Sequence, residues 1–401
     1  MSPKLLIIGA GREQLPAFQI ARRLGLTILA TDRDPAAPGR TLADQFVQVS
    51  TDDLTANLAV ARQHQIQGVM TLCLESSVPV VAAIATRLGL PGISEQTAFL
   101  ATNKNAMRAA LAQAGVAQPP FRPVAELADA QAFLADQGLP LVVKPSDGSG
   151  QKATALLYEA DQLAAWVAKA QAHARDGQAI VEGFIPGREI NVTVVVHRGR
   201  IQVTSLSDRV TAALPHFGIA LRHVAPPDLD PSGRAQVEQL AAVAVRAIGM
   251  DEGIAYPQIL WDGTQAWLVE IAARIPGGFM ADVARYVSGI DLVEVAILQA
   301  LGRPFELADL ARQEPKPGFV VDFITRLDVP GAVQRVSQIQ GLDAAQNSPG
   351  VERVFLGLKP GDPIPALTHS GARFGAIFAS GADRHQALIR AAAAKALIQI
   401  D

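Results

Sequence analysis

The sequence contains a single cysteine, Cys73, and this scarcity excludes several kinds of site. One thiol cannot close an intramolecular disulfide or build a cysteine-rich zinc site. Cys73 lies in the apolar run VMTLCLES, so we interpret it as a small core residue rather than a nucleophile.

Long apolar runs and dense positive charge are also absent. No apolar stretch reaches the roughly 18 residues of a membrane span, and the run LLIIGAG is too short for a signal peptide. The net charge is -3, without a basic tract, which argues against nucleic acid and anionic membranes as partners. We therefore expect a soluble cytoplasmic protein with no nucleic-acid or membrane partner.

The chain does have the apolar material for large cores. Of its 401 residues, 49% are hydrophobic and 18% are charged. The length suggests two or three domains. The patterns predict a mixed α/β and α+β protein with a parallel-sheet domain over 1–93, a central domain over 94–312 and a small α+β domain over 313–401.

Residues 4–93 alternate strand and helix. The apolar strands KLLIIGAG, LTILATDRD and GVMTLCLES are separated by helical segments, a pattern typical of a parallel sheet. Ligands of such sheets bind beyond the carboxyl ends of the strands, so Glu75 and Ser76 are candidates for substrate contact. A solvated loop explains these two residues equally well.

The first strand ends in a glycine turn that suggests dinucleotide binding. Gly9, Gly11 and Asp32 fit that fingerprint, but Gln14 replaces its third glycine. We keep a nicotinamide-dependent oxidoreductase only as a weaker hypothesis.

Residues 139–154, LPLVVKPSDGSGQKAT, predict a lid over a polyphosphate. A short apolar strand ends at Lys144, and a loop with serines, glycines and Lys152 follows. Glycines let the backbone approach a ligand, loop N–H groups contact phosphate oxygens, and lysines supply positive charge. No Gly-Lys-Ser/Thr opens a helix, so this is not a P-loop. A structural turn with a solvated lysine is the alternative.

Charged residues lie on both sides of this loop. The predicted helix NKNAMRAALAQAG carries Lys104 and Arg108 on one face, which local evidence favours as a solvated basic face. Downstream, Glu182 and Glu189 flank a Pro-Gly turn, and alternation in EINVTVVV places Glu189, Asn191 and Thr193 on one face. Ordinary hairpin charges also explain the two glutamates.

Residues 209–227, RVTAALPHFGIALRHVAPP, are predicted to be irregular. His216 and His223 in this segment are candidates for substrate contact, although we favour ordinary loop histidines.

Residues 254–278 predict a hairpin that turns at an Asp-Gly pair. Folding at that turn brings Gln258 nearly opposite Glu270, where an amide and a carboxylate suit magnesium. An edge-strand salt bridge is the alternative. The candidate substrate-contacting positions that follow the hairpin are Arg274, Gly277 and Gly278.

Together these motifs resemble the ATP-grasp superfamily, and within it carboxylate–amine ligases of the L-amino-acid ligase type. The resemblance covers nearly the whole chain, with five motifs in family order: IIGAG, NKNAMR, VVKPSDGSGQKAT, VEGFIPGREINV and VEIAARIPGG. It implies an ATP-grasp fold, with a Rossmann-like pre-ATP-grasp domain over 1–93, two subdomains clamping ATP over 94–312, and a C-terminal α+β domain.

The resemblance also implies ATP and Mg2+ as cofactors and assigns roles to residues. Lys104 and Lys144 would hold phosphates, Glu189 would bind the ribose, and Gln258 and Glu270 would hold the metal. Arg274, the other implied catalytic residue beside Lys144, would grip a substrate carboxylate or acyl phosphate. The implied ATP-binding set is Lys104, Lys144, Ser146, Gly148, Ser149, Gly150, Glu182, Gly183, Phe184, Ile185 and Glu189.

This sequence departs from the family pattern at two metal positions. Gln258 stands where an acid is usual, and Ala272 replaces the asparagine of Glu-x-Asn. These changes remove one charge and one oxygen ligand from a two-magnesium site. They motivate an alternative hypothesis, a non-catalytic ATP-binding module of the same fold.

The main hypothesis is an ATP-dependent ligase that forms an amide through an acyl phosphate. Its expected partners are a small-molecule carboxylate, such as an amino acid, and an amine. The resemblance also suggests a homodimer.

Overall fold

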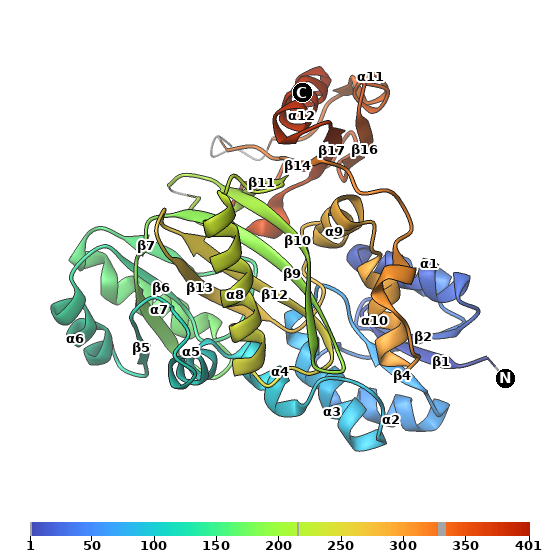
Figure 1. The fold of residues 1–401 in the computed structure, drawn as a ribbon, viewed down its shortest axis with the longest axis horizontal. Coiled ribbons are helices and arrows are strands. Elements are labelled where there is room, and N and C mark those ends of the chain that lie inside the picture. The colour runs from blue at the N-terminus through green and yellow to red at the C-terminus, as the bar shows by residue number, and fades with distance from the viewer. Residues whose placement is uncertain (1, 215, 328–333) are drawn as a thin grey trace.

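The computed structural model describes residues 2–214, 216–327 and 334–401, and within them the strands form four sheets (Figure 1). A parallel sheet contains the N-terminal strands, a large antiparallel sheet occupies the centre, and a smaller antiparallel sheet lies on its other side. The fourth sheet pairs β15 Ile339–Gln340 with β18 Gln399–Ile400. The predicted segments 209–227 and 313–401 each include positions outside the described ranges.

The N-terminal sheet is parallel, as predicted, with the order β3-β2-β1-β4. Its strands are β1 Lys4–Ile8, β2 Thr27–Asp32, β3 Gln45–Gln48 and β4 Gly68–Met70, and the helices between them are α1 Leu15–Arg23 and α2 Leu54–His64, with α3 Val78–Leu88 after β4. Strand β3 was not predicted, because its sequence, QFVQ, is short and half polar. Strand β4 is shorter than predicted, and beyond it Cys73 turns the chain with a φ of 62°.

The glycine turn after β1 is closed by the protein itself. Asp32 accepts a hydrogen bond from the Ala10 amide at 2.7 Å, and its other oxygen accepts one from the Asp34 amide. Both oxygens of Asp32 thus support the local backbone.

The smaller antiparallel sheet follows two capped helices, α4 Glu95–Thr102 and α5 Lys104–Gln113. Ser94 caps α4, because its hydroxyl accepts a hydrogen bond from the Thr97 amide. The strand order is β5-β8-β6-β7. These elements are β5 Phe121–Val124, β6 Leu141–Pro145, β7 Ala155–Leu157 and β8 Ala179–Gly183, with α6 Leu127–Gln137 and α7 Leu163–His173 packed on them.

The central sheet has the order β13-β12-β9-β10-β11-β14-β17-β16 and is antiparallel. Its strands are β9 Arg188–His197, β10 Arg200–Thr211, β11 Ala220–Ala225, β12 Gly253–Trp261, β13 Ala266–Ala272, β14 Gly318–Ile324, β16 Val351–Leu356 and β17 Gly375–Gly381. Ile190, Val192 and Val194 pack in one core with helix α8 Pro231–Ala247. The alternate positions Glu189 and Asn191 therefore share the opposite face, as predicted.

The prediction of an irregular segment over 209–227 is wrong for its two ends. Strand β10 continues to Thr211, and β11 forms from Ala220 to Ala225. Strand β11 pairs with β10 on one side and with β14 on the other, where Asp322 is paired with Arg222. The β14 partner lies about one hundred positions downstream and leaves no local signal in the sequence.

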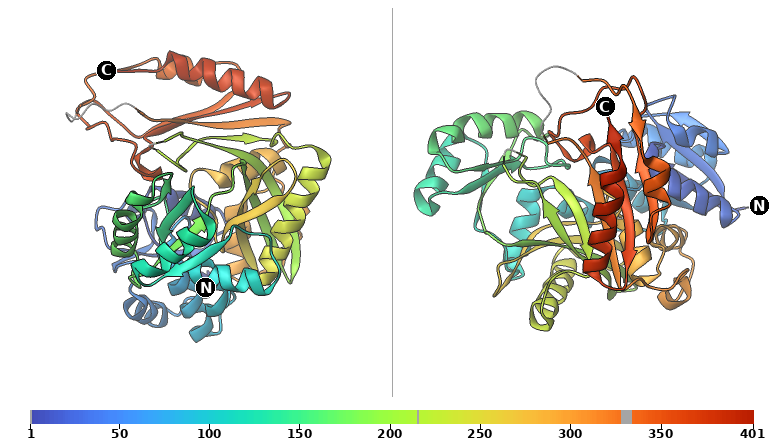
Figure 2. Two further views of the ribbon diagram at one scale, coloured as in Figure 1. Left: turned by 90° about the vertical axis from the view of Figure 1, so that its left-hand side faces the viewer. Right: turned by 90° about the horizontal axis from the view of Figure 1, so that it is seen from above.

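The C-terminal strands β14, β16 and β17 extend the central sheet, while β15 and β18 pair with each other. The helices here are α9 Met280–Ser288, α10 Leu292–Ala300, α11 Leu342–Gln346 and α12 Arg384–Leu397, and α12 lies over β14 and β17 (Figure 2). The domain boundaries at 93 and 312 stay predictions.

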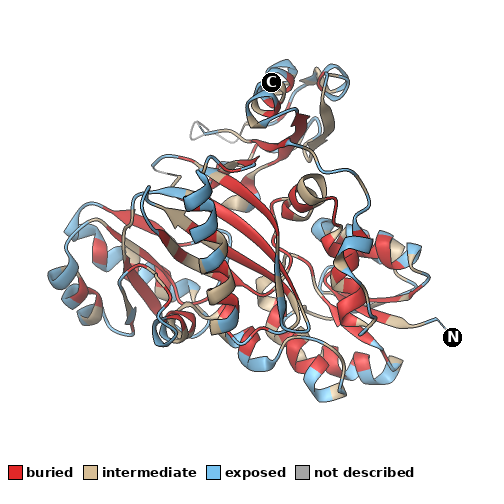
Figure 3. Ribbon diagram, in the orientation of Figure 1, coloured by how far each residue is buried: buried red, intermediate tan, exposed pale blue. Residues whose placement is uncertain are grey.

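Burial follows this arrangement, with buried strands between helices whose outer faces are exposed (Figure 3). No helix in the described ranges is both long and apolar enough to cross a bilayer.

Candidate active site

A cleft of about 280 Å³ lies between the smaller sheet and the central sheet. Apolar Val142, Leu260 and Val269 form part of its wall. Most of the predicted ATP- and metal-binding residues line it: Lys104, Lys144, Gly148, Ser149, Gly150, Glu182, Gly183, Phe184, Ile185, Glu189, Gln258 and Glu270. The fold thus brings together motifs that are far apart in the sequence.

The glycine-rich loop is held from two directions. Gly148 and Gly150 have φ values of 95° and 80°, with no atom within 4 Å of an added β-carbon. The backbone conformation, rather than lack of space, therefore favours glycine there. Lys104 Nζ donates to the Gly148 carbonyl at 2.8 Å, and the Ser370 amide donates to the Gly150 carbonyl at 3.1 Å.

Glu182 lies between two cations in the wall of the cleft. Its Oε1 accepts a hydrogen bond from Arg108 Nε at 2.9 Å, and its Oε2 lies 2.8 Å from Lys144 Nζ. Burial would raise the pKa of Glu182, but Arg108 and Lys144 outweigh it and lower the pKa to about 2. Burial lowers the pKa of Lys144, against the opposing effect of Glu182. Glu182 is therefore ionised and fixes the position of Lys144.

Arg108 is fully buried, so the expectation of a solvated basic face is wrong for this residue. Its Nη1 and Nη2 donate to the carbonyls of Leu268 and Val269 in β13 at 2.8 and 2.6 Å. Through Glu182, the same guanidinium holds β8. Arg108 therefore connects the two walls of the cleft. The only sequence signal for this position was the i,i+4 spacing of Lys104 and Arg108, which places both residues on one face of α5. That face turns toward the cleft.

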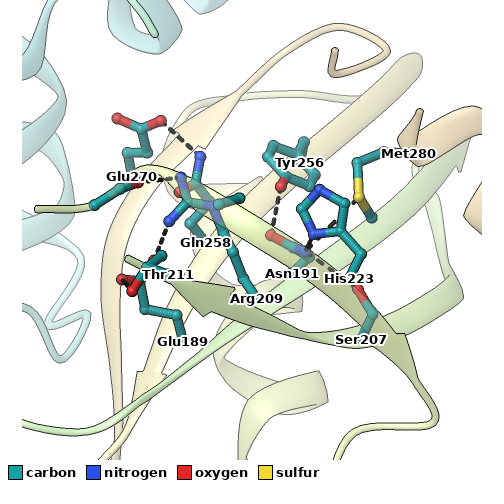
Figure 4. Close-up of polar contacts among 12 residues, drawn as sticks. Glu189, Asn191, Ser207, Arg209, Thr211, His223, Tyr256, Gln258, Glu270 and Met280 are labelled. Carbon is teal, nitrogen blue, oxygen red and sulfur yellow. Dashed lines mark hydrogen bonds and ion pairs between the residues drawn. The ribbon is translucent and has the colours of Figure 1, made fainter. Parts of the chain in front are cut away.

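Glu189 is held by Arg209, a residue that the sequence did not single out. Arg209 Nη1 donates to Glu189 Oε2, and Thr211 Oγ1 lies 3.3 Å from the other carboxylate oxygen (Figure 4). Burial would lower the pKa of Arg209, but Glu189 outweighs it and the pKa is raised. Arg209 Nη2 also donates to the Gly218 carbonyl at 2.6 Å.

Gln258 and Glu270 are directly opposed in β12 and β13, as predicted. Gln258 Nε2 donates to Glu270 Oε1 at 2.8 Å (Figure 4). No group of three His, Cys, Asp or Glu side chains suited to a metal occurs in the ranges that the structure covers. One carboxylate and one amide oxygen nevertheless fit a magnesium ion that takes its other ligands from phosphates and water.

Arg274 leaves the end of β13 and contacts Glu75 in the short 3-10 helix Glu75–Ser77. Its Nε donates to Glu75 Oε2 at 2.7 Å, and its Nη2 donates to the same oxygen. Burial would lower the pKa of Arg274, but Glu75 outweighs it and the pKa is raised. Glu75 also lines a small hollow beside the cleft, together with Lys104 and Glu270.

A buried polar network lies next to these residues. Tyr256 Oη donates to Asn191 Oδ1 at 2.5 Å, and Asn191 Nδ2 lies 2.9 Å from His223 Nδ1 and 3.1 Å from Ser207 Oγ (Figure 4). Burial, with Arg373 nearby, lowers the pKa of His223 well below its ordinary value. His223 is therefore a neutral buried residue of β11 and not a loop histidine.

Eight predicted site residues lie outside the lining of the cleft: Glu75, Ser76, Ser146, His216, His223, Arg274, Gly277 and Gly278. Ser146 is buried and its hydroxyl donates to Asp176 at 2.5 Å. His216 contacts the Leu367 carbonyl at 2.7 Å. Ser76 lies beside Glu75 and lines neither hollow. Contacts of these residues with ligands stay predictions.

Three family models match successive parts of the chain. The "Carbamoyl-phosphate synthase L chain, ATP binding domain" matches residues 103–308, just over half of the chain. The "ATP-grasp N-terminal domain" matches residues 18–92, and the "L-amino acid ligase C-terminal domain 2" matches residues 329–401.

Curated relatives and solved structures agree with these matches. An alanine–anticapsin ligase of Bacillus subtilis is 24% identical over 322 residues, 69% of this chain and 67% of that protein. A formate-dependent phosphoribosylglycinamide formyltransferase of Nitratidesulfovibrio vulgaris is 27% identical over 413 residues, 99% and 96% of the two chains. An L-amino acid ligase structure from Bacillus licheniformis has a TM-score of 0.84 at 24% identity, covering 100% of this chain and 98% of the other.

The structural likeness confirms the predicted ATP-grasp architecture. A phosphoribosylglycinamide synthetase from Anaerococcus prevotii has a TM-score of 0.80 at 18% identity, with both chains fully covered. A structural match at 18% sequence identity shows the fold alone, and the matched family models show the family. The chain belongs to the ATP-grasp family of carboxylate–amine ligases, enzymes that use ATP to form C–N bonds.

Proposed function

We propose that the protein activates the carboxylate of a small molecule with ATP and joins it to an amine through an acyl phosphate. The observation that carries this proposal is the small hollow that adjoins the cleft. Lys104 and Glu270 line both spaces, and Glu75, the partner of Arg274, lines the hollow. A carboxylate held by Arg274 would therefore lie beside the phosphate end of ATP.

Two displacements account for the reaction. A carboxylate oxygen attacks the γ-phosphorus, the bond to the bridging oxygen breaks, and ADP leaves. The amine nitrogen then attacks the acyl carbon, the bond from that carbon to the phosphate oxygen breaks, and phosphate leaves as the nitrogen loses a proton. Neither step needs a protein nucleophile, so the enzyme contributes positioning and charge neutralisation.

The side chains in the cleft have matching roles. Lys104 and Lys144 would hold the ATP phosphates, and Arg274 would orient the acid and stabilise the acyl phosphate. Gln258 and Glu270 would hold a magnesium ion, which supplies charge neutralisation between phosphates when bound. Glu189, fixed by Arg209, would accept hydrogen bonds from the ribose.

We propose amino acids as substrates. This rests on the printed names of two similar proteins, an alanine–anticapsin ligase and an L-amino acid ligase, and on the C-terminal family match. A homodimer and a cytoplasmic location remain expectations from the sequence.

The test is ADP release from ATP and magnesium with the 20 common amino acids, singly and in pairs. A parallel assay contains hydroxylamine, which converts an acyl phosphate into a hydroxamate. ADP release that requires an amino acid, together with its hydroxamate, is the expected result. ATP binding by thermal shift without ADP or hydroxamate from any amino acid would contradict the proposal and favour the non-catalytic module.

A further inference from the structure

The glycine-rich lid loop, residues 148–152, is anchored by a residue of the C-terminal part of the chain. The amide N–H of Ser370 donates to the Gly150 carbonyl at 3.1 Å. Gly150 lies between β6 and β7 of the smaller sheet, and Ser370 lies between β16 and β17 of the central sheet. This hydrogen bond therefore joins the two walls of the cleft at the lid loop itself.

The chain between β10 and β11 also joins the lid loop to the C-terminal part. The Gln151 side chain lies against Gly218, with Oε1 2.8 Å from the position that a β-carbon of residue 218 would occupy. His216 Nδ1 lies 2.7 Å from the Leu367 carbonyl, and Ile219 packs with Leu367 in a small apolar cluster. The amide–carbonyl bond is therefore one of several contacts that hold the lid loop in this position.

The lid loop depends on its anchors because it is exposed to solvent at residues 148–150. Within residues 2–214, 216–327 and 334–401, the hydrogen bonds that reach the loop from outside come from Lys104 Nζ and from the Ser370 amide. Lys104 would also hold ATP phosphates. Ser370 is therefore the support whose role does not change when ATP binds.

The short 3-10 helix Ser370–Ala372 begins at this anchor, and His369 caps it. His369 Nδ1 accepts a hydrogen bond from the Gly371 amide at 3.0 Å, and the His369 backbone is extended, with φ −162° and ψ 166°. Burial, with Lys152 nearby, lowers the pKa of His369. The imidazole is therefore neutral at neutral pH and does not repel the lysine of the lid loop.

From these contacts we infer that Ser370 is a positioning residue of the active site: its backbone N–H holds the Gly150 carbonyl and so keeps the lid loop over the phosphates of ATP. The inference rests on the proposed function and adds the C-terminal part of the chain to the machinery that binds ATP. A loop that is already held in its binding conformation loses less conformational freedom when the ligand arrives, which raises affinity.

Ser370→Pro tests the anchor because it removes this N–H. Proline is tolerated at the first position of a helix, and the extended backbone of His369 suits a residue that precedes proline. Ser370→Ala is the matched control, because it removes the hydroxyl and keeps the amide. Calorimetric titration measures the binding of ATP and of adenosine, which carries no phosphate, to each protein. Thermal unfolding checks that each variant folds.

We expect Ser370→Pro to weaken ATP binding about threefold to tenfold, the effect of one hydrogen bond, and to change adenosine binding by less than about twofold. Ser370→Ala should bind both ligands like wild type. In ADP release, Ser370→Pro should raise the KM for ATP by the same factor and leave the KM for the amino acid within about twofold of wild type.

Hydrogen exchange of the unmodified protein tests the anchor without a variant. Coupling between sites is reciprocal, so an anchor that favours ATP binding is itself strengthened by ATP. The peptide that contains Ser370 should exchange at least about threefold more slowly with magnesium and a non-hydrolysable ATP analogue. Adenosine should leave its exchange unchanged.

Equal ATP affinity of folded Ser370→Pro and wild type would overturn the inference, as would an equal loss of ATP and adenosine binding. An equal loss in Ser370→Ala, or unchanged exchange at Ser370 with the ATP analogue, would also overturn it. None of these outcomes depends on ADP release, so they are distinct from failure of the proposed function. If wild type binds ATP but releases no ADP with any amino acid, the proposed function fails, and weaker ATP binding by Ser370→Pro would still support the anchor.

Discussion

Arg274 and Glu75 form an ion pair across 199 positions of the sequence, with Nε 2.7 Å from Oε2. The pair joins the end of β13 in the central sheet to the chain that follows β4 in the N-terminal sheet. Glu75 therefore orients the guanidinium that would grip the acid. The N-terminal sheet takes part in the site through this contact.

Replacement of Arg274 tests this arrangement. Arg274→Met should lower kcat for ADP release at least about 100-fold, because it removes the cation that would stabilise the developing acyl phosphate. ATP binding, measured by thermal shift, should stay close to that of wild type. Glu75→Gln keeps the shape of the partner and should cost less than Arg274→Met. Turnover like wild type in Arg274→Met would remove this residue from the mechanism.

Restoring an acid at residue 258 tests the metal site. Gln258→Glu should lower the magnesium concentration needed for half-maximal ADP release several-fold, because it adds a carboxylate opposite Glu270. Glu270→Gln should abolish or greatly weaken magnesium dependence and ADP release. Magnesium titration at fixed ATP measures both effects. An unchanged magnesium midpoint in Gln258→Glu would show that this position does not hold the ion.

Removal of one partner from the Arg108–Glu182 pair should destabilise the protein strongly. Glu182→Gln leaves Arg108 and Lys144 without their shared counterion, at a cost of about 3 kcal/mol or more in the free energy of unfolding, whereas Arg108→Met leaves Glu182 paired with Lys144 alone. The double variant should lose less than the sum of the two single losses. Urea unfolding of all four proteins provides the cycle. Additive losses would show that the two side chains act independently.

His223 should make stability depend on pH. Its pKa is lowered in the folded protein, so below its ordinary value of about 6.5 the unfolded chain binds a proton more readily. Stability present above pH 6.5 is then lost as pH falls, by up to about 1.4 kcal/mol per pH unit. Urea unfolding at pH 7.5 and 5.5 should show a smaller loss for His223→Gln than for wild type. Equal losses in both would assign the dependence to other groups.

Local sequence patterns predicted the positions of cleft residues well where neighbouring residues determine the backbone geometry. The Asp-Gly turn predicts the hairpin that brings Gln258 near Glu270, and a register shift between Gln258 and Ile259 sets the two residues directly opposite. Alternation along β9 placed Glu189 and Asn191 on one face for the same reason. Both predictions needed only neighbouring residues.

Residues whose role depends on distant partners could not be predicted. Arg108 is buried because a carboxylate and two backbone carbonyls from other strands accept hydrogen bonds from its guanidinium. The sequence of its helix, taken alone, predicts a solvent-exposed arginine. Arg209 lies in a segment without a motif, and only the assembled sheet brings it to Glu189. His223 was predicted to be a loop residue, although β11 pairs with the neighbouring β10 and with β14 about one hundred positions downstream.

The continuity of the central sheet bears on how the chain can be divided. Strand β14 pairs with β11 along its length, and Phe319, Val320 and Val321 are fully buried there. A protein cut at residue 313 would leave β11 as a bare edge strand with open N–H and C=O groups, which template pairing between molecules. Such a fragment should self-associate, so the last 88 or so residues act as an integral cover of the catalytic sheet and not as a detachable module.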